Sequence, residues 1–426
     1  MVARLQFEGI RCFFTPQDAI IRPVTLLVGE NSSGKTTFLA LCQIASSITQ
    51  GFDQELPFND PPFLLGAYDQ IASYRGGRAG RAKSFSITVS VDDDSQEASI
   101  RAEFVSRNGQ PSLHVWRLTV GSLLLQATPN AGRGTISVVF ESPRARREVP
   151  EVERFWAARL IDFAFEFMPE HPRFKELTDV FSKSDRDTLN IALVSIHAAF
   201  GRRPYAFAPI RTSPQRTYDP VSAEPKPEGS HVPMLLAALS HSGTKGQWAT
   251  VSSALEEFGS KSNLFEEIEV IRKGKKESDP FQIGVKSGGP TFNLVDVGYG
   301  VSQALPILVD TLQRASTDEV FLLQQPEVHL HPRAQAELGS FFARQAGRRG
   351  NFVIETHSDH LVDRIRMEVR GGRLRPEDVS LLYFERHEKH GATIHNLELA
   401  KDGSITNPPP GYRQFFLDEE RSLLGV

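Results

Sequence analysis

Central to this chain is the stretch Gly29-Glu30-Asn31-Ser32-Ser33-Gly34-Lys35-Thr36-Thr37. An apolar run at residues 24–28 precedes it, and a run with helical periodicity at residues 37–48 follows it. A strand that breaks into a glycine-rich turn and continues as a helix directs main-chain N–H groups and the positive end of the helix at one point. This arrangement is typical of a phosphate-binding loop.

The spacing of this stretch matches the pattern G-x-x-x-x-G-K-[ST], and the flanking runs supply the strand–loop–helix context that the pattern requires. Gly29 and Gly34 allow the backbone to turn. Lys35 is placed to reach the β- and γ-phosphates of a nucleotide, and the Thr36 hydroxyl is placed to bind Mg²⁺. The alternative is a chance Gly/Ser turn between a strand and a helix. Because spacing and context agree, the pattern favours a nucleotide site that other parts of the chain must complete.

The size and composition are those of a globular protein. With 426 residues, of which 40% are hydrophobic and 23% charged, the chain is long enough for one elaborated α/β unit or for two lobes that share a sheet. The net charge of −4 argues against a surface that is coated by nucleic acid throughout, although local basic patches are compatible with it.

The sequence predicts a cytoplasmic protein. No apolar run approaches the roughly 20 residues that cross a bilayer, and Met1 leads directly into strand-like sequence without an apolar signal segment. Cys12 follows an apolar run and Cys42 lies on the helix after the phosphate loop, which is typical of buried thiols in a reducing compartment. We expect no membrane contact by the chain itself.

Periodicity divides the chain into four predicted parts. We expect a phosphate-loop core from residues 1–60 and 280–400, an antiparallel β lobe at 61–150, a helical and mixed insert at 151–279, and a C-terminal tail at 401–426. Short alternating runs between residues 84 and 140, separated by turn residues, predict an antiparallel meander within the β lobe.

Helical periodicity begins at residue 151 and continues to residue 200, with Trp156 and Phe163 among the apolar positions. Heptads do not persist, and Pro169 and Pro172 interrupt the run. We therefore expect a compact helical insert and not a long coiled-coil arm.

The sequence allows two interpretations of each of two loops that contain arginines. The Gly/Arg cluster at residues 75–81 could contact phosphates of nucleic acid, but a solvated turn is the favoured interpretation. In the Pro-rich connector at residues 211–233, Arg211 and Arg216 either meet phosphate or pair with carboxylates.

A glycine-bearing turn at residues 293–303 opens a second helix. It contains Asp296, Gly298 and Gly300, and it lies far downstream of the phosphate loop. A helix N-terminus is an anion site, and one bound nucleotide seldom uses two of them within one chain. We therefore expect this turn to act across a dimer interface.

Two buried strands at residues 320–323 and 352–354 continue into polar segments. The first continues as Gln324-Gln325-Pro326-Glu327-Val328-His329-Leu330-His331-Pro332, and the second as Glu355-Thr356-His357-Ser358. Polar groups at the carboxyl ends of parallel strands lie where open α/β sheets bind ligands. We expect both segments beside the phosphate loop.

The order of these motifs resembles the ABC-type ATPase heads of the SMC, RecF and OLD group, and the AAA-type ATPase subunits of antiphage defence systems are similar. The resemblance covers residues 1–50 and 290–365 well and the middle in outline. It implies an α/β fold, an ABC-type ATPase head with a mixed phosphate-loop sheet, an antiparallel β lobe and a compact helical insert. It also implies ATP and Mg²⁺ as cofactors.

The resemblance assigns roles to particular residues. Catalytic roles fall to Gln325, Glu327 and His357, the last at the position of the switch histidine. Magnesium contacts fall to Thr36, to Gln324 and to a lid glutamine, for which Gln70 is the candidate. Asp296 stands where related heads carry the serine of the signature turn. The residues expected at ATP are Glu30, Asn31, Ser32, Ser33, Gly34, Lys35, Thr36, Thr37, Asp296, Gly298 and Gly300.

The chain departs from the resembled heads where they read Asp-Glu-Pro-Glu, because Gln324 and Gln325 are amides. An amide cannot accept a proton from attacking water. Either Glu327 acts as the base instead, or Gln325 orients the water while phosphate takes the proton. We expect an ATPase with non-acidic Walker B residues and slow or conditional hydrolysis.

Histidines suggest a metal cluster as an alternative. His329 and His331 lie near Glu327, and His357 lies near Asp359 and His360. Residues i and i+2 of an extended segment face the same way and could form a ligand pair. The favoured interpretation is the D-loop, because Leu-His-Pro is a routine feature of the resembled heads.

The leading functional hypothesis is a head that dimerises, or forms a higher oligomer, through the ATP site and couples closure to DNA or an effector protein, in phage defence or genome maintenance. A nuclease would be a separate chain, because the about 60 residues after 366 cannot build a Toprim domain. The alternative is a nucleotide-gated scaffold or regulatory subunit that binds ATP without turnover. The altered signature and the large insert disfavour a transporter subunit.

Overall fold

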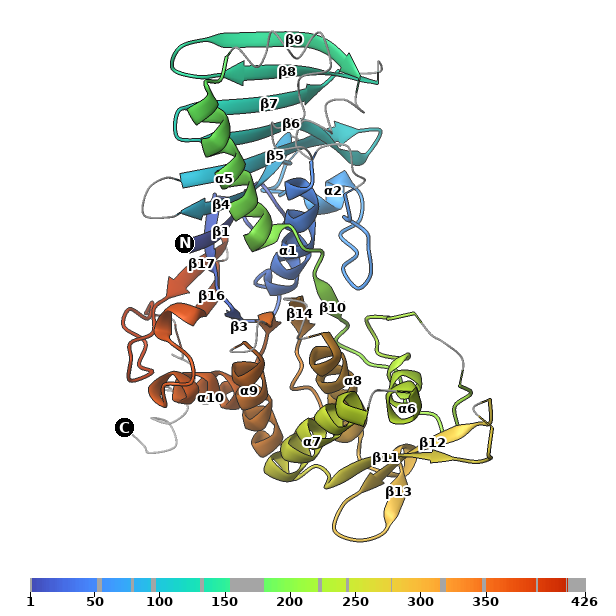
Figure 1. The fold of residues 1–426 in the computed structure, drawn as a ribbon. Helices are drawn as coiled ribbons and strands as arrows, with labels where there is room; N and C mark the ends of the chain where they lie inside the picture. The colour runs from blue at the N-terminus through green and yellow to red at the C-terminus, as the bar shows by residue number, and fades with distance from the viewer. Residues whose placement is uncertain are drawn as a thin grey trace. The chain divides into compact units, whose positions relative to one another are not determined.

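The computed structural model divides the chain into two compact units (Figure 1). The first comprises Met1–Ile21, Gly29–Pro204 and Tyr383–Asn396, and the second Arg22–Val28, Tyr205–Leu382 and Leu397–Val426. The structure describes residues 2–51, 56–77, 80–92, 97–130, 134–153, 180–220, 224–242, 245–276, 278–314, 319–346, 350–387, 390–410 and 412.

The first unit contains an eight-stranded antiparallel sheet in the order β2-β1-β4-β5-β6-β7-β8-β9. The strands are β1 (Val2–Glu8), β2 (Gln17–Ile21), β4 (Ser84–Asp92), β5 (Glu97–Arg107), β6 (Gln110–Val120), β7 (Leu123–Pro129), β8 (Thr135–Glu141) and β9 (Arg146–Glu153). The predicted meander between residues 84 and 140 is confirmed as β4 to β8. The N-terminal hairpin β1–β2 extends the same sheet, because β1 pairs with β4.

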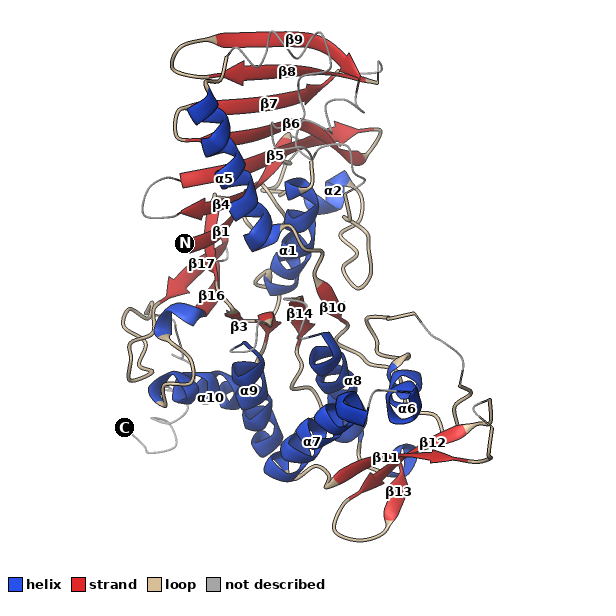
Figure 2. Cartoon of the chain, in the orientation of Figure 1, coloured by secondary structure: helices blue, strands red, loops and turns tan. Residues whose placement is uncertain are grey.

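Helices of the first unit pack on this sheet (Figure 2). They are α1 (Lys35–Thr49), α2 (Tyr68–Ile71) and α5 (Lys183–Phe200). Along β5, Ile100, Ala102 and Phe104 are fully buried and alternate with more exposed residues, as a half-covered strand requires. The buried Trp116 of β6 donates its indole N–H to the carbonyl oxygen of Ile48 at 2.9 Å, which fixes the end of α1 against the sheet.

The helical interpretation is wrong at residues 151–153, which end β9. Val149 and Val152 pair with Val138 and Ile136 of β8. Pairing with a distant strand outweighs local periodicity here. The predicted helix is present as α5 at Lys183–Phe200. Trp156, Phe163, Pro169 and Pro172 lie outside the described residues, as does most of the predicted tail.

The second unit is built on parallel strands in the order β10-β14-β15-β3, followed by the first part of β16. The strands are β10 (Tyr205–Phe207), β14 (Val320–Gln324), β15 (Asn351–Glu355), β3 (Val24–Gly29) and β16 (Val379–His387). Phe321, Leu322 and Leu323 of β14 are fully buried, as expected of parallel strands covered on both faces. The rest of β16 and most of β17 (Gly391–Leu397) belong to the first unit.

Helices and a small antiparallel sheet, β11-β12-β13, complete the second unit. The helices are α6 (Val232–Ser242), α7 (Lys245–Ser262), α8 (Tyr299–Arg314), α9 (Pro332–Ala346) and α10 (Asp359–Arg370), and the strands are β11 (Glu267–Arg272), β12 (Phe281–Lys286) and β13 (Thr291–Asn293). Over the described ranges, no helix is both long and apolar enough to cross a bilayer. The mixed α/β fold of the described residues, with two antiparallel sheets and one parallel-centred sheet, agrees with the predicted fold class.

A buried polar network fixes α8 to β10. Asp310, 1% exposed, accepts hydrogen bonds from the Tyr205 hydroxyl at 2.8 Å and from His231 Nε2 at 2.9 Å. The Lys226 N–H donates to His231 Nδ1, so the proton of the neutral ring lies on Nε2 and points at Asp310.

We expect Asp310→Ala to lower the free energy of unfolding by about 3 kcal/mol, because it leaves two buried donors without an acceptor. Tyr205→Phe should cost about 1 kcal/mol. Urea unfolding followed by circular dichroism measures both, with the exposed Asp187→Ala on α5 as control. Equal midpoints for Asp310→Ala and the control would contradict this prediction.

Candidate functional site

The phosphate-type loop lies between β3 and α1, in the first unit. Gly29 and Gly34 adopt left-handed φ values of 136° and 100°. A Cβ atom at Gly29 would overlap the carbonyl oxygen of Phe384, and one at Gly34 would overlap the ring of Phe13. Both positions therefore require glycine, as the sequence pattern predicts.

The first turn of α1 is prepared for an anion. The N-cap residue Gly34 has no side chain to cap the helix and no acidic residue lies in the first turn, so the positive end of α1 favours a negatively charged ligand. Lys35 is 3% exposed, and its Nζ donates to the carbonyl oxygens of Gly29 at 3.0 Å and Glu30 at 2.6 Å. The loop thus holds the ammonium group across its own backbone, while Thr36 is exposed at its rim.

Arg11 supports this loop, although no motif in the sequence marks it. Its guanidinium donates to the Thr37 hydroxyl at 3.2 Å, to the Leu65 carbonyl at 3.0 Å and to the Gln70 carbonyl at 3.4 Å. Burial lowers the pKa of Arg11, although the group stays within the strongly basic class. Arg11 therefore fixes the start of α1 with a positive charge beside it.

Gln70, the candidate lid glutamine, lies exposed on the short helix α2. Its side-chain Oε1 accepts a hydrogen bond from the Ala67 N–H at 3.0 Å. The side chain therefore caps its own helix, and it would have to leave this bond to reach a metal ion.

In the second unit, the carboxyl ends of three parallel strands lie side by side. Gln324 of β14 pairs with Glu355 of β15, and Glu355 pairs with Leu27 of β3. The Gln325 N–H donates to the Glu355 carbonyl at 2.8 Å, and the Thr356 N–H donates to the Leu27 carbonyl at 3.1 Å. The chain leaves β3 at this edge directly into Gly29, the first residue of the phosphate-type loop.

The segment after β14 is bent and buried. Gln325 has a left-handed φ of 41°, which is uncommon for a side chain with a Cβ, and Gln324 is 8% exposed. Glu327 is 7% exposed, and its Oε1 accepts a hydrogen bond from the His357 N–H at 2.7 Å. Its Oε2 has no hydrogen-bond partner among the described residues. The exposed His357 follows β15. The three predicted catalytic residues, Gln325, Glu327 and His357, therefore lie at the same edge of the sheet.

Burial raises the pKa of the Glu327 carboxyl above its ordinary value, while the His357 N–H, the N–H of Glu327 itself, the Thr356 hydroxyl and, last, the charge of Arg211 oppose the shift. A buried carboxylate with one open oxygen and a raised pKa is suited to accept a proton. Glu327 is thus the carboxylate of the Gln324–Glu327 segment that can act as a base, whereas Gln324 and Gln325 cannot.

Arg211 lies on the loop after β10 and is 3% exposed. Its N–H donates to the Gln303 Oε1 on α8 at 3.4 Å. None of its three guanidinium nitrogens has a hydrogen-bond partner among the described residues. Burial lowers the pKa of Arg211 to about 10, and the charge of Glu327 opposes this shift.

The predicted signature turn lies at the start of α8. Asp296 ends a 3-10 turn, Leu294–Asp296, and Gly298 is exposed just before the helix. Both carboxylate oxygens of Asp296 accept hydrogen bonds from Arg216, at 2.6 and 2.9 Å. This bidentate pair holds the pKa of Asp296 below its usual range. Gly300 lies within the first turn of α8, against the His329 carbonyl.

The two histidine clusters do not form a metal site in the described part of the chain. No group of three His, Cys, Asp or Glu side chains there is arranged to hold a metal ion. His331 Nδ1 accepts a hydrogen bond from the Ala334 N–H at the start of α9. In the Gly/Arg cluster, Arg75 donates to the Phe14 carbonyl and Arg81 to the carbonyls of Asp69 and Ala72, while Arg78 lies outside the described residues.

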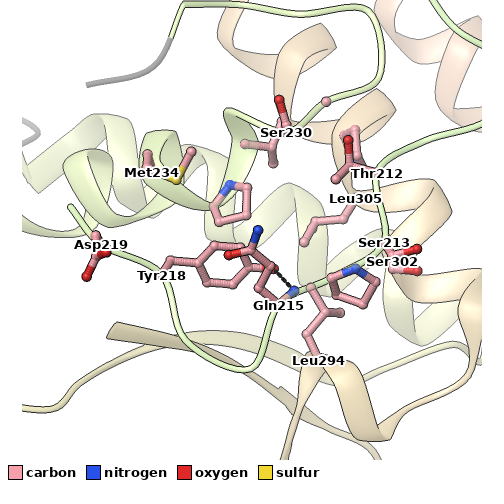
Figure 3. A pocket seen from close by; sticks show the side chains of 15 residues that line it. Thr212, Ser213, Gln215, Tyr218, Asp219, Ser230, Met234, Leu294, Ser302 and Leu305 are labelled. Carbon is pink, nitrogen blue, oxygen red and sulfur yellow. Dashed lines mark hydrogen bonds between the residues drawn. The ribbon is translucent and has the colours of Figure 1, made fainter. Parts of the chain in front are cut away.

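A cavity of about 300 Å³ adjoins the Arg211 loop in the second unit (Figure 3). Thr212 and Ser213 of this loop and Ser302 and Leu305 of α8 are among the residues that line it. The Tyr218 hydroxyl accepts a hydrogen bond from the Gln215 N–H at 2.8 Å, which shapes the loop around the cavity.

Residues 24–363 match a family model described as "AAA domain, putative AbiEii toxin, Type IV TA system". Among solved structures, the Smc head domain of Pyrococcus furiosus, with an extended coiled coil and bound to the C-terminal domain of ScpA, is similar at 11% identity and a TM-score of 0.46, over 99% of each chain. The SMC head domain of Thermotoga maritima is similar at 12% identity and a TM-score of 0.44, over 93% of this chain and 99% of that chain. No curated protein matches the sequence.

The residues present fit ATP and Mg²⁺. In the first unit, the start of α1 and the enclosed ammonium of Lys35 suit phosphate oxygens, and Thr36 carries a hydroxyl of the kind that Mg²⁺ accepts. In the second unit, Gln324 carries an amide oxygen, which is also a ligand that Mg²⁺ accepts. The matched region runs from β3 through the phosphate-type loop to the start of α10, more than half of the chain. The chain therefore belongs to the AAA family described as "AAA domain, putative AbiEii toxin, Type IV TA system".

Proposed function

We propose that this protein is an ATP-binding, ABC-type ATPase head that dimerises around ATP, hydrolyses it slowly or conditionally, and passes the closure to DNA or to a separate effector protein. Membership of an AAA family supports nucleotide binding. The observation that carries the proposal is the shared sheet edge, at which β3 leads into Gly29 while β14 and β15 end in Gln324 and Glu355. Phage defence or genome maintenance is the context that the family resemblance suggests.

In this proposal Lys35 and the first N–H groups of α1 bind the β- and γ-phosphates of ATP. Thr36 and Gln324 would hold Mg²⁺, and Gln70 is the further candidate. The ion would neutralise charge that develops on the phosphate oxygens. Glu327 accepts the proton of the attacking water while the oxygen of that water bonds to the γ-phosphorus and the bond to the β-phosphate oxygen breaks.

The base assignment predicts that Glu327→Gln lowers the single-turnover rate of ATP hydrolysis about a hundredfold or more, because an amide cannot take the proton. ATP affinity should stay within about twofold, since the change removes no phosphate contact. Single-turnover assays with radiolabelled ATP measure both quantities. An unchanged rate in Glu327→Gln, together with a large loss in Gln325→Ala, would show that Gln325 orients the water and phosphate takes the proton.

Dimerisation is proposed from the turn at Asp296, Gly298 and Gly300. This turn is exposed at the start of α8, where a helix N-terminus can bind the triphosphate held by a second copy. A carboxylate there would repel phosphate, but the bidentate contact with Arg216 compensates its charge. Arg216 and Asp296 together then present a nearly neutral surface to the nucleotide.

We expect Arg216→Ala to weaken ATP-dependent dimerisation roughly tenfold, because the Asp296 carboxylate then faces the triphosphate uncompensated. Adding Asp296→Ser to that variant should restore dimerisation, since it removes the repelling charge. Sedimentation velocity with a slowly hydrolysed ATP analogue measures the dissociation constant. Failure of the double variant to recover would count against contact between this turn and phosphate.

A second candidate function is a nucleotide-gated scaffold that binds ATP without turnover. The amides at Gln324 and Gln325 favour it, because they remove both acidic residues that related heads use. Phosphate release above the background of Lys35→Ala separates the two functions. Duplex DNA and co-purifying proteins are the partners to test, each with and without ATP.

A further inference from the structure

We infer that Arg211 is a positioning residue for Glu327: its buried guanidinium holds the ionised carboxylate in place at the end of β14, while its main chain ties that site to α8. The inference rests on the proposed function, in which Glu327 takes part in hydrolysis. Nothing in the motif pattern assigns a role to Arg211, which lies in the Pro-rich connector between the recognisable motifs.

Arg211 carries a buried positive charge that has no hydrogen-bond partner among the described residues. Arg211 is 3% exposed, and its three guanidinium nitrogens have no hydrogen-bond partner among the described residues. Burying a guanidinium in this way is unfavourable unless an opposite charge compensates it. Glu327, 7% exposed, supplies that charge, and its Oε2 is likewise without a hydrogen-bond partner among the described residues. Phe207 of β10 pairs with Leu323 of β14, and Arg211 and Glu327 each follow their paired residue by four positions, so both groups lie just after the ends of neighbouring parallel strands in the second unit. The charge of each group opposes the effect of burial on the pKa of the other.

Arg211 and Arg216 lie in one loop but differ in burial and in hydrogen bonding. Arg216 is exposed and already forms a bidentate pair with Asp296. Arg211 is buried and forms no hydrogen bond with a carboxylate of the part of the chain that the structure describes. A guanidinium with all its donors open beside a base is positioned to restrain that base, or the water between them, without consuming the oxygen that must accept a proton.

The main chain of Arg211 is connected to α8. The Arg211 N–H bonds to Gln303 on α8, the helix that begins at the signature turn. Thr212 and Ser302, the neighbours of these two residues, line the same cavity (Figure 3). A displacement of the start of α8 would therefore move Arg211 relative to Glu327. In this way closure at the signature turn can alter the base.

Arg211 matters more here than it would beside an acidic Walker B pair. With amides at Gln324 and Gln325, Glu327 is the carboxylate of its segment. Burial favours its protonated form, and a protonated carboxyl cannot act as a base. The positive charge of Arg211 opposes that protonation. Among the described residues, β15 and its continuation bring two further titratable residues to this edge, Glu355 and His357.

The test uses Arg211→Met and Arg211→Gln, the conservative Arg211→Lys, Glu327→Gln and the double variant Arg211→Met/Glu327→Gln, all in the full chain. We expect Arg211→Met and Arg211→Gln to lower the single-turnover rate of ATP hydrolysis roughly tenfold to a hundredfold, with ATP affinity within about twofold. Arg211→Lys should recover most of the rate. The double variant should be no slower than Glu327→Gln alone, because Arg211 acts through Glu327.

The pH profile adds a readout that a purely structural role would not move. Removing the positive charge should shift the midpoint of the Glu327-dependent rate to higher pH in Arg211→Met and leave it nearly unchanged in Arg211→Lys. Urea unfolding reports whether each variant is folded, and Arg211→Gln carries the same test if Arg211→Met does not fold.

Four results would overturn the inference. The first two are a full rate of hydrolysis in folded Arg211→Met and Arg211→Gln, and losses of rate that multiply in the double variant. The others are a loss of ATP affinity as large as the loss of rate, and the absence of any Glu327-dependent hydrolysis in the wild type. Each of these leaves ATP-dependent dimerisation intact. Failure of the proposed function itself appears differently, as wild-type protein that neither binds ATP more tightly than Lys35→Ala nor dimerises with it.

Discussion

Replacing Lys35 with alanine should lower the affinity for Mg·ATP at least about a hundredfold, because charge-assisted contacts to two phosphate groups are lost together. Lys35 is 3% exposed and its Nζ is held by the carbonyl oxygens of Gly29 and Glu30. Without the ammonium group those two oxygens remain inside the loop and direct their partial negative charges toward the phosphate position. The variant therefore loses attraction and gains repulsion.

Titration calorimetry with a slowly hydrolysed ATP analogue measures this loss. The matched control is Lys83→Ala, which removes an exposed lysine from the same unit and should leave the affinity unchanged. Circular dichroism should show that both variants fold, because α1 retains its packing on the antiparallel sheet. Wild-type affinity in Lys35→Ala would mean that nucleotide does not bind at this loop.

The second large effect is a gain of activity. We expect Gln324→Asp/Gln325→Glu to raise the rate of ATP hydrolysis about a hundredfold to ten-thousandfold, because it supplies a metal-binding carboxylate and a general base where the chain has amides. Gln325→Glu nearly preserves side-chain shape, and the Gln325 N–H bond to the Glu355 carbonyl does not involve the side chain. The backbone that places the new base should therefore be retained.

The same substitution should destabilise the protein when Mg²⁺ is absent. Gln324 is 8% exposed and pairs with Glu355 of β15, so a carboxylate there loses its hydration and lies beside another acidic residue. Mg·ATP should restore the thermal midpoint. Steady-state phosphate release measures the rate, with the exposed Gln313→Glu as control, and adding Lys35→Ala should abolish the gain. No gain in rate would mean that the amides are not what limits hydrolysis.

Part of this site can be predicted because its signals are local. Gly29 and Gly34 lie in left-handed conformations that other residues rarely adopt, so a fixed glycine spacing marks the loop. The strands β14 and β15 are covered on both faces, so each appears as a continuous apolar run followed by polar residues. Sequence patterns of this kind depend on neighbours along the chain.

The rest depends on contacts between distant residues. The strand β10 has only three residues, Tyr205–Phe207, too few for a periodic pattern, and it is defined by pairing with β14. Arg11 and Arg211 look like any loop arginine in the sequence, and only the fold shows that the first supports α1 and that the second is buried after β10, the strand that pairs with β14. The end of β9 was predicted as helix because its pairing with β8 leaves no local signal.

In the proposed function, ATP bound at the Lys35 loop joins two copies of this chain. Light scattering tests this by the molar mass of Glu327→Gln with Mg·ATP, with Mg·ADP and without nucleotide. Mg·ATP alone should double the mass, and the doubling should be absent when Lys35→Ala is added. A mass that is the same in all three conditions would contradict it.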